Sequence, residues 1–331
     1  MRRQSRRHPV GRRFAQYGLL LGLLVVGSFA LPRLAPGDPL TYLVGGNEAA
    51  AFSSEERERA LAQYGLDAPL HEQFLDYVGG VVSGDLGTSV RYGATVSDVL
   101  LDRLPWTLLL VGLAGVLAAA LALGAALAGA RRRGAGAGDT DLLAGILLLS
   151  STPPFFLGML ILAIVSAELG LLPAYGATAS GGETPFVGVL ERLAMPLVTL
   201  TVTTTGVVYL IARSALLSEL TQGYVRFARA KGVSEQRILR RHVLRNALLP
   251  IVTIFMVSLG DVLGGAVVVE TVFAYPGLGT AIYEGVLARD YPLLQGALLL
   301  VAVVVVAANA IADGLYTLID PRVRRADGVP R

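Results

Sequence analysis

The chain has 331 residues, of which 53% are hydrophobic and only 16% are charged. Soluble domains carry about 25% charged residues, so this composition argues against a soluble domain and indicates a membrane protein. The sequence contains no cysteine, which excludes disulfide bonds, thiolate metal sites and cysteine nucleophiles. The formal net charge is only +3, so the positions of the basic residues matter more than their sum.

Six stretches of the chain are apolar and long enough to cross a bilayer, which takes about 20 mostly apolar residues in a helix. The first is longer than the core of a signal peptide and ends in a poor cleavage sequence, so we expect a retained helix. We predict an all-α membrane protein with six transmembrane helices at residues 14–32, 104–130, 142–167, 193–212, 248–269 and 291–317.

The basic residues are distributed unequally between the two sides of these six spans. Of the 28 Lys and Arg, 21 fall on one side, in residues 1–13, 131–133, 213–247 and 318–331. The other side holds seven, five of them in residues 33–103. Because the cytoplasmic side carries the excess of positive charge, we predict a multi-pass protein of the cell membrane with both termini in the cytoplasm.

Residues 33–103 form the one sizeable polar piece, a helical extracytoplasmic insertion after the first span. Ser53 and Glu56 have the spacing of a capping box, which predicts a helix that ends near Gly65. A second amphipathic helix is predicted for residues 69–82, where the apolar residues share one face. The insertion is too small to be a separate catalytic domain. We expect it to pack on the outer mouth of the pore, either as a brace or as a contact surface.

Polar or irregular positions inside the spans are candidates for a transport pathway. Pro153 and Pro154 remove two helix donors and predict a kink or break in the third span. Thr203 belongs to a run of hydroxyl residues in the fourth span that either bond their own backbone or line a pore. Asp261 is an acid at membrane depth, set among glycines that favour close helix packing. Packing or an interhelical hydrogen bond remains the alternative for each of these residues.

The sequence lacks the motifs of common catalytic and metal sites. A phosphate-binding loop needs Gly-x-x-x-x-Gly-Lys-Ser/Thr, and the single lysine, Lys231, is instead followed by Gly232. The three histidines are far apart in the sequence and have no metal-ligand spacing. We therefore predict that the chain is not an enzyme and holds no catalytic residue, metal or cofactor of its own.

The loop 213–247 is too long for a minimal turn between two spans. Residues 224–231 predict a short helix that ends at Gly232, because glycine adopts left-handed backbone angles at little cost. Ser234 is placed to cap a second short helix, in which apolar residues alternate with arginines. Two short helices joined at a glycine would form a protruding knob that suits a groove on a partner protein. A basic loop that only fixes the topology is the alternative.

This loop resembles the Glu-Ala-Ala loop of ABC-importer permeases, which docks on the ATPase. Only Ala228 matches that triplet, but the segments 228–232 and 244–250 are similar to the variant in the dipeptide, oligopeptide and nickel permease subfamily. Further segments in the same order resemble the first, or B-type, permease of that subfamily: Arg33-Leu-Ala-Pro-Gly-Asp-Pro39, Gly84-Asp-Leu-Gly-Thr-Ser89, Val269-Glu-Thr-Val-Phe-Ala-Tyr-Pro-Gly-Leu-Gly279 and Arg289-Asp-Tyr-Pro292.

The resemblance implies the type I importer fold, with a permease domain over residues 94–317. It implies import by alternating access, driven by two separate ATPase subunits that carry ATP and magnesium. The other implied partners are a homologous second permease and an extracytoplasmic substrate-binding protein, in the plasma membrane of a prokaryote. The residues implied to contact the ATPase are Arg226, Phe227, Ala228, Arg229, Ala230, Lys231, Gly232 and Val233.

Peptides are the expected cargo, with nickel chelates or sugars as alternatives within the same family. Two readings from other classes are a secondary carrier without an ATPase and a membrane scaffold that transports nothing. A proton-coupled carrier usually keeps several ionisable groups inside the bilayer. Here Asp261 is the one acid in the middle of a predicted span, which is thin support for a proton relay.

Overall fold

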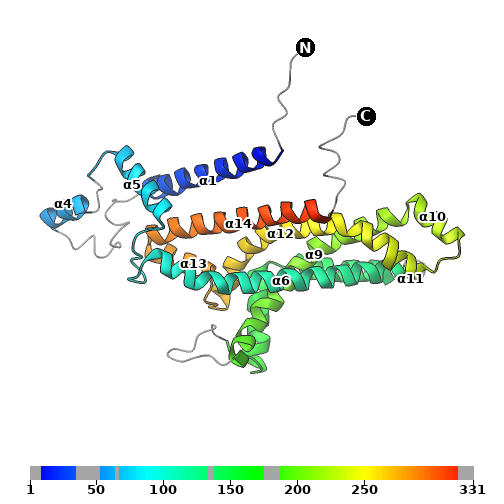
Figure 1. The fold of residues 1–331 in the computed structure, drawn as a ribbon. Coiled ribbons are helices and arrows are strands. Elements are labelled where there is room, and N and C mark those ends of the chain that lie inside the picture. The colour runs from blue at the N-terminus through cyan, green and yellow to red at the C-terminus, as the bar shows by residue number, and fades with distance from the viewer. Residues whose placement is uncertain (1–8, 35–52, 64–66, 133–137, 175–185, 320–331) are drawn as a thin grey trace, which may run out of the picture. The chain divides into compact units, whose positions relative to one another are not determined.

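The computed structural model describes residues 9–34, 53–63, 67–132, 138–174 and 186–319. Figure 1 shows that the elements of these segments are helices, and the one isolated β-bridge joins Thr88 to Thr95. The prediction of an all-helical protein is therefore confirmed for the described part of the chain.

The α-helices follow the predicted spans and add shorter elements between them. In chain order they are α1 (Pro9–Leu34), α4 (Ser54–Gln63), α5 (Leu70–Ser83), α6 (Val96–Arg132), α7 (Gly138–Ser150), α8 (Pro154–Ile161), α9 (Phe186–Leu220), α10 (Gly223–Ala230), α11 (Glu235–Arg237), α12 (Leu244–Val272), α13 (Leu278–Ala288) and α14 (Tyr291–Ile319). Two segments are π-helical, η1 (Leu162–Glu168) after α8 and η2 (Ile238–Val243) before α12.

Three helices of the described residues are long and apolar enough to cross a membrane: Val96–Ala130, Gly188–Leu220 and Tyr291–Ile311. The bent pair formed by α7 with α8 and η1 would make a fourth span, and Gln16–Ala30 is a shorter apolar helix. The predicted fifth span coincides with α12, whose side chains at 253–261 lie outside the described residues. The boundaries at which these helices cross a bilayer therefore stay a prediction.

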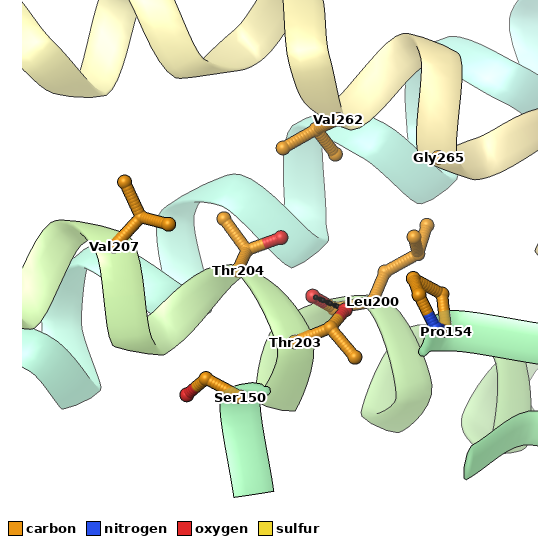
Figure 2. A pocket seen from close by; sticks show the side chains of 8 residues that line it. All are labelled: Ser150, Pro154, Leu200, Thr203, Thr204, Val207, Val262 and Gly265. Atoms are coloured by element: carbon orange, nitrogen blue, oxygen red, sulfur yellow. Dashed lines mark hydrogen bonds between the residues drawn. The ribbon is translucent and has the colours of Figure 1, made fainter. Parts of the chain in front are cut away.

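The third predicted span is broken where the two prolines stand. The helices on either side of the break, Asp141–Ser150 and Pro154–Glu168, make an angle of 92°. Figure 2 shows Ser150 and Pro154 on the two sides of this break. Pro153 occupies the N-cap of α8 and Pro154 its first position. A proline is tolerated there because an N–H at this position would have no hydrogen-bond partner within the helix. The predicted break is confirmed, and the prolines start a new helix there.

The described chain divides into two compact units. The first contains the residues up to Pro105 and Ala281–Ala307, and the second contains Trp106–Thr280 and the residues from Ala308. The helices α6, α13 and α14 contribute residues to both units. All contacts discussed below lie within one unit.

In the first unit, α5 packs on α1 through aromatic side chains. The ring centroid of Phe29 lies 5.1 Å from that of Phe74 and 5.6 Å from that of Tyr77. The predicted capping box is also present, because Glu56 Oε2 accepts a hydrogen bond from the Ser53 N–H at 2.9 Å. That bond lowers the pKa of Glu56 below its ordinary value. Both helices predicted for the insertion are therefore confirmed.

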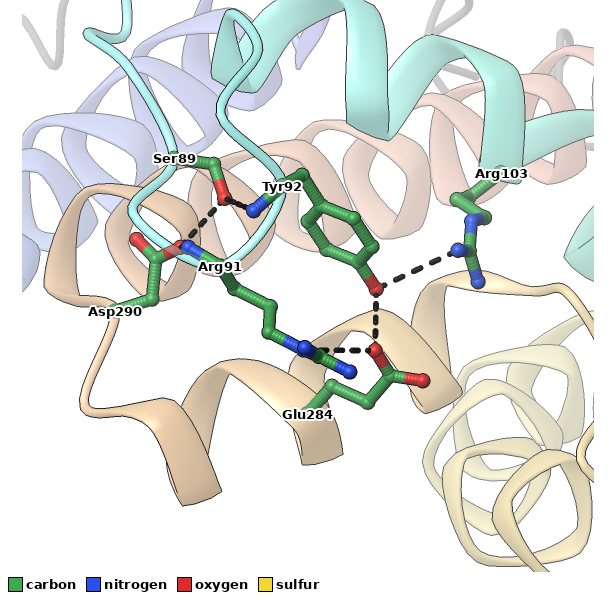
Figure 3. Close-up of polar contacts among 6 residues, drawn as sticks. All are labelled: Ser89, Arg91, Tyr92, Arg103, Glu284 and Asp290. Carbon is green, nitrogen blue, oxygen red and sulfur yellow. Dashed lines mark hydrogen bonds and ion pairs between the residues drawn. The ribbon is translucent and has the colours of Figure 1, made fainter.

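A clasp of polar residues, shown in Figure 3, joins the turn at 89–92 to the α13–α14 connection in the first unit. The buried carboxylate of Asp290 accepts hydrogen bonds from Ser89 Oγ at 2.5 Å and from the Arg91 N–H at 3.0 Å. Its other oxygen accepts from the Leu293 N–H at 3.1 Å, which caps the start of α14. At the edge of the clasp, Tyr92 Oη donates to Glu284 at 3.0 Å. The clasp brings together the motifs at 84–89 and 289–292, which are about 200 residues apart in the sequence.

In the second unit, α9 packs against α12, α7 and α8. The α9 helix approaches α7 tightly at Gly206, where a Cβ atom would overlap Cβ and Oγ of Ser150. A glycine is therefore required at this crossing so that the two helices can touch. The backbone of α9 at this point needs no left-handed angle, so only the contact explains the residue.

We expect Gly206→Ala to destabilise the second unit by about 1–3 kcal/mol, because the new methyl group overpacks the α7–α9 contact. Thermal unfolding of the purified full chain in detergent measures the effect. Gly124→Ala is the control, since nothing lies within 4 Å of the position of its Cβ. Ser150→Gly should rescue Gly206→Ala, and equal melting temperatures for Gly206→Ala and Gly124→Ala would rule out the contact.

We expect Ser89→Ala to cost about 1–3 kcal/mol, because Asp290 would then be buried with one donor fewer. Arg91→Ala serves as the control, since it keeps the backbone donor to Asp290 and removes only an exposed ion pair with Glu284. Limited proteolysis of the 84–95 segment in the full chain reports the loosening. Cleavage of Ser89→Ala no faster than that of Arg91→Ala would contradict the role of the clasp.

Candidate functional site

The knob, residues Gly223–Val243, lies between α9 and α12 in the second unit. Figure 1 shows its helices α10 and α11 at one end of α9 and α12. Gly232 separates α10 from α11 with φ of 75°, so the predicted left-handed glycine is confirmed. Ser234 stands at the N-cap of α11 as predicted, but its side chain makes no capping hydrogen bond. The two short helices of the prediction are therefore present, with the second continuing into η2.

The knob is anchored by apolar side chains that are buried against the ends of the long helices. Val225 of α10 and Ile238, Leu239 and Val243 of η2 are all buried. They share one core cluster with residues of α9 and α6: Tyr209, Ala212, Leu216, Ala122 and Ala126. Burying each large apolar side chain contributes about 1.5–3 kcal/mol, so the knob is fixed to α9 and not a loose loop.

An ion pair bridges the glycine that separates the two knob helices. Arg229 Nε lies 2.6 Å from Glu235 Oε1, and its second nitrogen donates to Oε2 at 3.2 Å. This two-point contact raises the pKa of Arg229 and lowers the pKa of Glu235. Both side chains are about half exposed, so the pair links α10 to α11 across Gly232 but contributes little to stability. The sequence pattern placed Arg229 at a partner contact and gave no reason to single out Glu235.

The outward side of α10 presents aromatic and basic side chains. Tyr224, Phe227 and Lys231 recur at helical spacing and are exposed, with Phe227 at 62%. Lys231 Nζ lies 4.4 Å from the centroid of the Phe227 ring, and Tyr224 Oη donates to Glu219 at 2.6 Å. These three residues form the aromatic face of the knob.

The eight residues predicted to contact an ATPase do not all point outward. Arg226, Phe227, Arg229, Ala230, Lys231 and Gly232 are exposed, whereas Ala228 and Val233 are partly buried and pack against the knob's own core. Tyr224 was missed by the motif comparison, which starts two residues later. Its exposure beside Phe227 could have been found from the helical spacing alone.

A second candidate site is an open pocket of about 200 Å³ in the second unit. Figure 2 shows the side chains that line it. The lining residues are Ser150 of α7, Pro154 of α8, Leu200, Thr203, Thr204 and Val207 of α9, and Val262 and Gly265 of α12. The structure thus brings together Pro154 and Thr203, two of the four residues predicted to line a pathway. Pro153 is not among the lining residues, and the side chain of Asp261 lies outside the described residues.

The hydroxyl groups of this pocket also bond the helices that carry them. Thr203 Oγ1 donates to the carbonyl oxygens of Thr199 at 3.0 Å and Leu200 at 3.2 Å, and Ser150 Oγ donates to that of Ile146 at 2.6 Å. Thr203 therefore bonds its own helix, as one reading predicts, and it also lines the pocket, while its place in a pore stays a prediction. Among the described residues, those that line the pocket carry no charge, so they offer weak hydrogen bonds and apolar contact.

Comparison with known proteins gives a consistent result. Residues 114–325 match the family described as binding-protein-dependent transport system inner membrane component. The oligopeptide transport system permease protein AppB of Bacillus subtilis is 36% identical over 310 residues, 92% of this chain and 95% of that protein. The di/tripeptide permease protein DppB of Pseudomonas aeruginosa is 35% identical over 315 residues, 90% and 93% of the two chains.

The glutathione transport system permease protein GsiC of Salmonella choleraesuis is 37% identical over 312 residues, 93% of this chain and 96% of that protein. Among solved structures, a chain of the inward-facing MetNI methionine ABC transporter aligns with a TM-score of 0.54 and 20% identity. That alignment covers 67% of this chain and 96% of the other, which supports the predicted fold. The chain belongs to the family of binding-protein-dependent inner membrane components, the permease subunits of ABC importers.

Proposed function

We propose that this permease moves peptides across the cell membrane as half of a heterodimeric pore. The assignment of peptides as the cargo is supported by relatives that align over nearly the whole chain. These relatives are named as permeases for oligopeptides, di- and tripeptides and glutathione. Nickel chelates and sugars are not proposed as cargo, because the names of these three relatives mention neither. The proposed partners are a second permease, two ATPase subunits that hold ATP and magnesium, and an outer binding protein.

The chemistry of the pocket supports this cargo. A peptide that crosses the membrane must be held weakly enough to leave again, and a charged wall would hold its termini too tightly. The described lining of the pocket offers hydroxyl groups from Ser150, Thr203 and Thr204 beside apolar side chains. Backbone amides of many different peptides can bond such hydroxyls, which suits a pathway that does not itself select the sequence.

The knob supports coupling to a separate ATPase. Its aromatic face exposes Tyr224 and Phe227, and aromatic side chains are enriched in contact surfaces. Its opposite side is buried against α9 and α6, so a force on Phe227 would be transmitted to those helices rather than absorbed by a loop. ATP binding would move the ATPase subunits and thereby switch the access of the pathway.

The proposed orientation places both termini and the knob in the cytoplasm. It is supported by the concentration of 21 of the 28 basic residues on that side of the six predicted spans. The insertion between α1 and α6 would then lie outside, where the binding protein delivers its ligand.

We expect Tyr224→Ala combined with Phe227→Ala to abolish stimulated transport in proteoliposomes that contain the complete importer. Both side chains are exposed, so the variant should still fold and insert into the membrane. The ATPase subunits should either copurify with it less or hydrolyse ATP without driving transport. Gln236→Ala is the control, an exposed change on α11 outside the aromatic face. Transport at the rate of the control would overturn the coupling role of this face.

The absence of cysteine allows a direct test of the pocket. We expect Thr203→Cys and Thr204→Cys to react with a water-soluble methanethiosulfonate reagent in the reconstituted importer, and peptide substrate to slow the reaction. Leu210→Cys, on an exposed apolar position of the same helix α9, is the control and should stay unreactive. If Thr203→Cys is labelled no faster than Leu210→Cys, the pocket is not part of the pathway.

A further inference from the structure

Four arginines gather on one side of the segment that joins the knob to α12. Arg237 of α11, Arg240 and Arg241 of η2 and Arg245 of α12 follow each other at steps of three, one and four residues, which places them along one helical face. All four side chains are exposed. We call them the basic face, and the coupling role proposed above uses none of them.

The basic face is held outward by the packing of the opposite side. Ile238, Leu239 and Val243 are buried in the core cluster beneath η2, and Ala247 continues that buried row into α12. Because these residues fix the rotation of the segment about its axis, the arginines cannot turn inward. Four guanidinium groups thus remain side by side at the surface despite their mutual repulsion.

The described acidic residues next to the basic face in the sequence, Glu219 and Glu235, already have other partners. Glu235 is held by Arg229, and Glu219 accepts hydrogen bonds from Tyr224 and, at 3.5 Å, from Asn246. Within the described residues, none of the four arginines has a hydrogen-bond or ion-pair partner. Like charges gathered without counter-charges indicate that an anion from outside the chain completes the surface.

The position of the basic face relative to the membrane indicates which anion this is. η2 runs without interruption into α12, and the predicted fifth span begins at residue 248. At about 1.5 Å per residue, Arg241 and Arg245 lie within roughly 10 Å of the first apolar turn. The headgroup layer of one leaflet is about 5–8 Å thick, so the start of the predicted span places Arg245 at the depth of lipid phosphates and Arg241 at the outer edge of that layer, within reach of its long side chain.

We propose that the basic face binds the headgroups of anionic phospholipids in the leaflet on the side of the knob. Guanidinium groups bond phosphate oxygens in pairs, and clusters of basic residues directly beside a span attract acidic lipids. A bound lipid would hold the start of α12 at a fixed depth, while the aromatic face of α10 stays available to a protein partner. The inference rests on the membrane setting of the family and does not depend on the cargo.

The test measures lipids retained by the full chain after extraction from nanodiscs that contain phosphatidylglycerol and phosphatidylcholine in equal amounts. By native mass spectrometry, the wild type should retain phosphatidylglycerol preferentially. The variant with Arg240→Gln, Arg241→Gln and Arg245→Gln should lose this preference by about five-fold for each arginine removed. Replacement of the same three arginines by lysine should keep most of it, and raised salt should weaken it.

Arg226→Gln is the matched control, because Arg226 is an exposed arginine of α10 outside the basic face. It should retain phosphatidylglycerol as the wild type does. Unchanged preference in the triple glutamine variant would overturn the proposal. The proposal would also be overturned if the triple glutamine variant kept its lipid preference but no longer bound the ATPase subunit in lipid-free detergent. The basic face would then be a docking site for a protein. The single change Arg241→Gln should give a smaller loss if the triple variant proves unstable.

Discussion

The packing of α12 against α9 is the contact on which both candidate sites depend. At one end, both helices contribute to the core cluster that anchors the knob, through Tyr209 of α9 and Ala247 of α12. Further along, the same pair supplies most of the pocket, with Thr203 and Leu200 on one side and Val262 on the other. A shift of α12 along α9 would therefore move the knob and reshape the pocket together. The helix pair is thus a direct physical connection between the two candidate sites.

A chain at membrane depth must satisfy its backbone polar groups wherever a helix stops, and the structure does so with side chains. After α12 the backbone turns through Ala274, a residue with φ of 46°. The buried carboxylate of Glu270 crosses this turn and accepts the Gly279 N–H at 2.6 Å, at the start of α13. Thr107 completes the arrangement, because its hydroxyl donates to Glu270 at 2.7 Å and accepts the Leu278 N–H at 2.8 Å. The motif at 269–279 thus links α12 to α13 through Glu270, which is fully buried.

Local rules predicted the features that depend on neighbours in the sequence. The capping box at Ser53, the break at Pro153 and the left-handed Gly232 each follow from the chemistry of a few adjacent residues. The clasp at Asp290, the contact of Gly206 with Ser150 and the fastening by Glu270 join segments that are distant in the sequence. A single sequence shows the polar or small residue in each case but not its partner. For the same reason the motif could mark residues 226–233 but could not show that Ala228 and Val233 point inward.

The two exposed faces of the knob differ in a way that separates their partners. Phe227 and Tyr224 stand on α10, at the part of the knob that precedes Gly232, and the arginines of the basic face stand on the part that leads into α12. The Arg229–Glu235 pair links these parts, since both helices contribute one charge to it. If a partner pulls on the aromatic face, as proposed, the pull would act through this joint on the segment that is proposed to bind anionic headgroups. With the basic end held at the headgroups, such a pull would rotate α12 about that end and would not withdraw the whole helix.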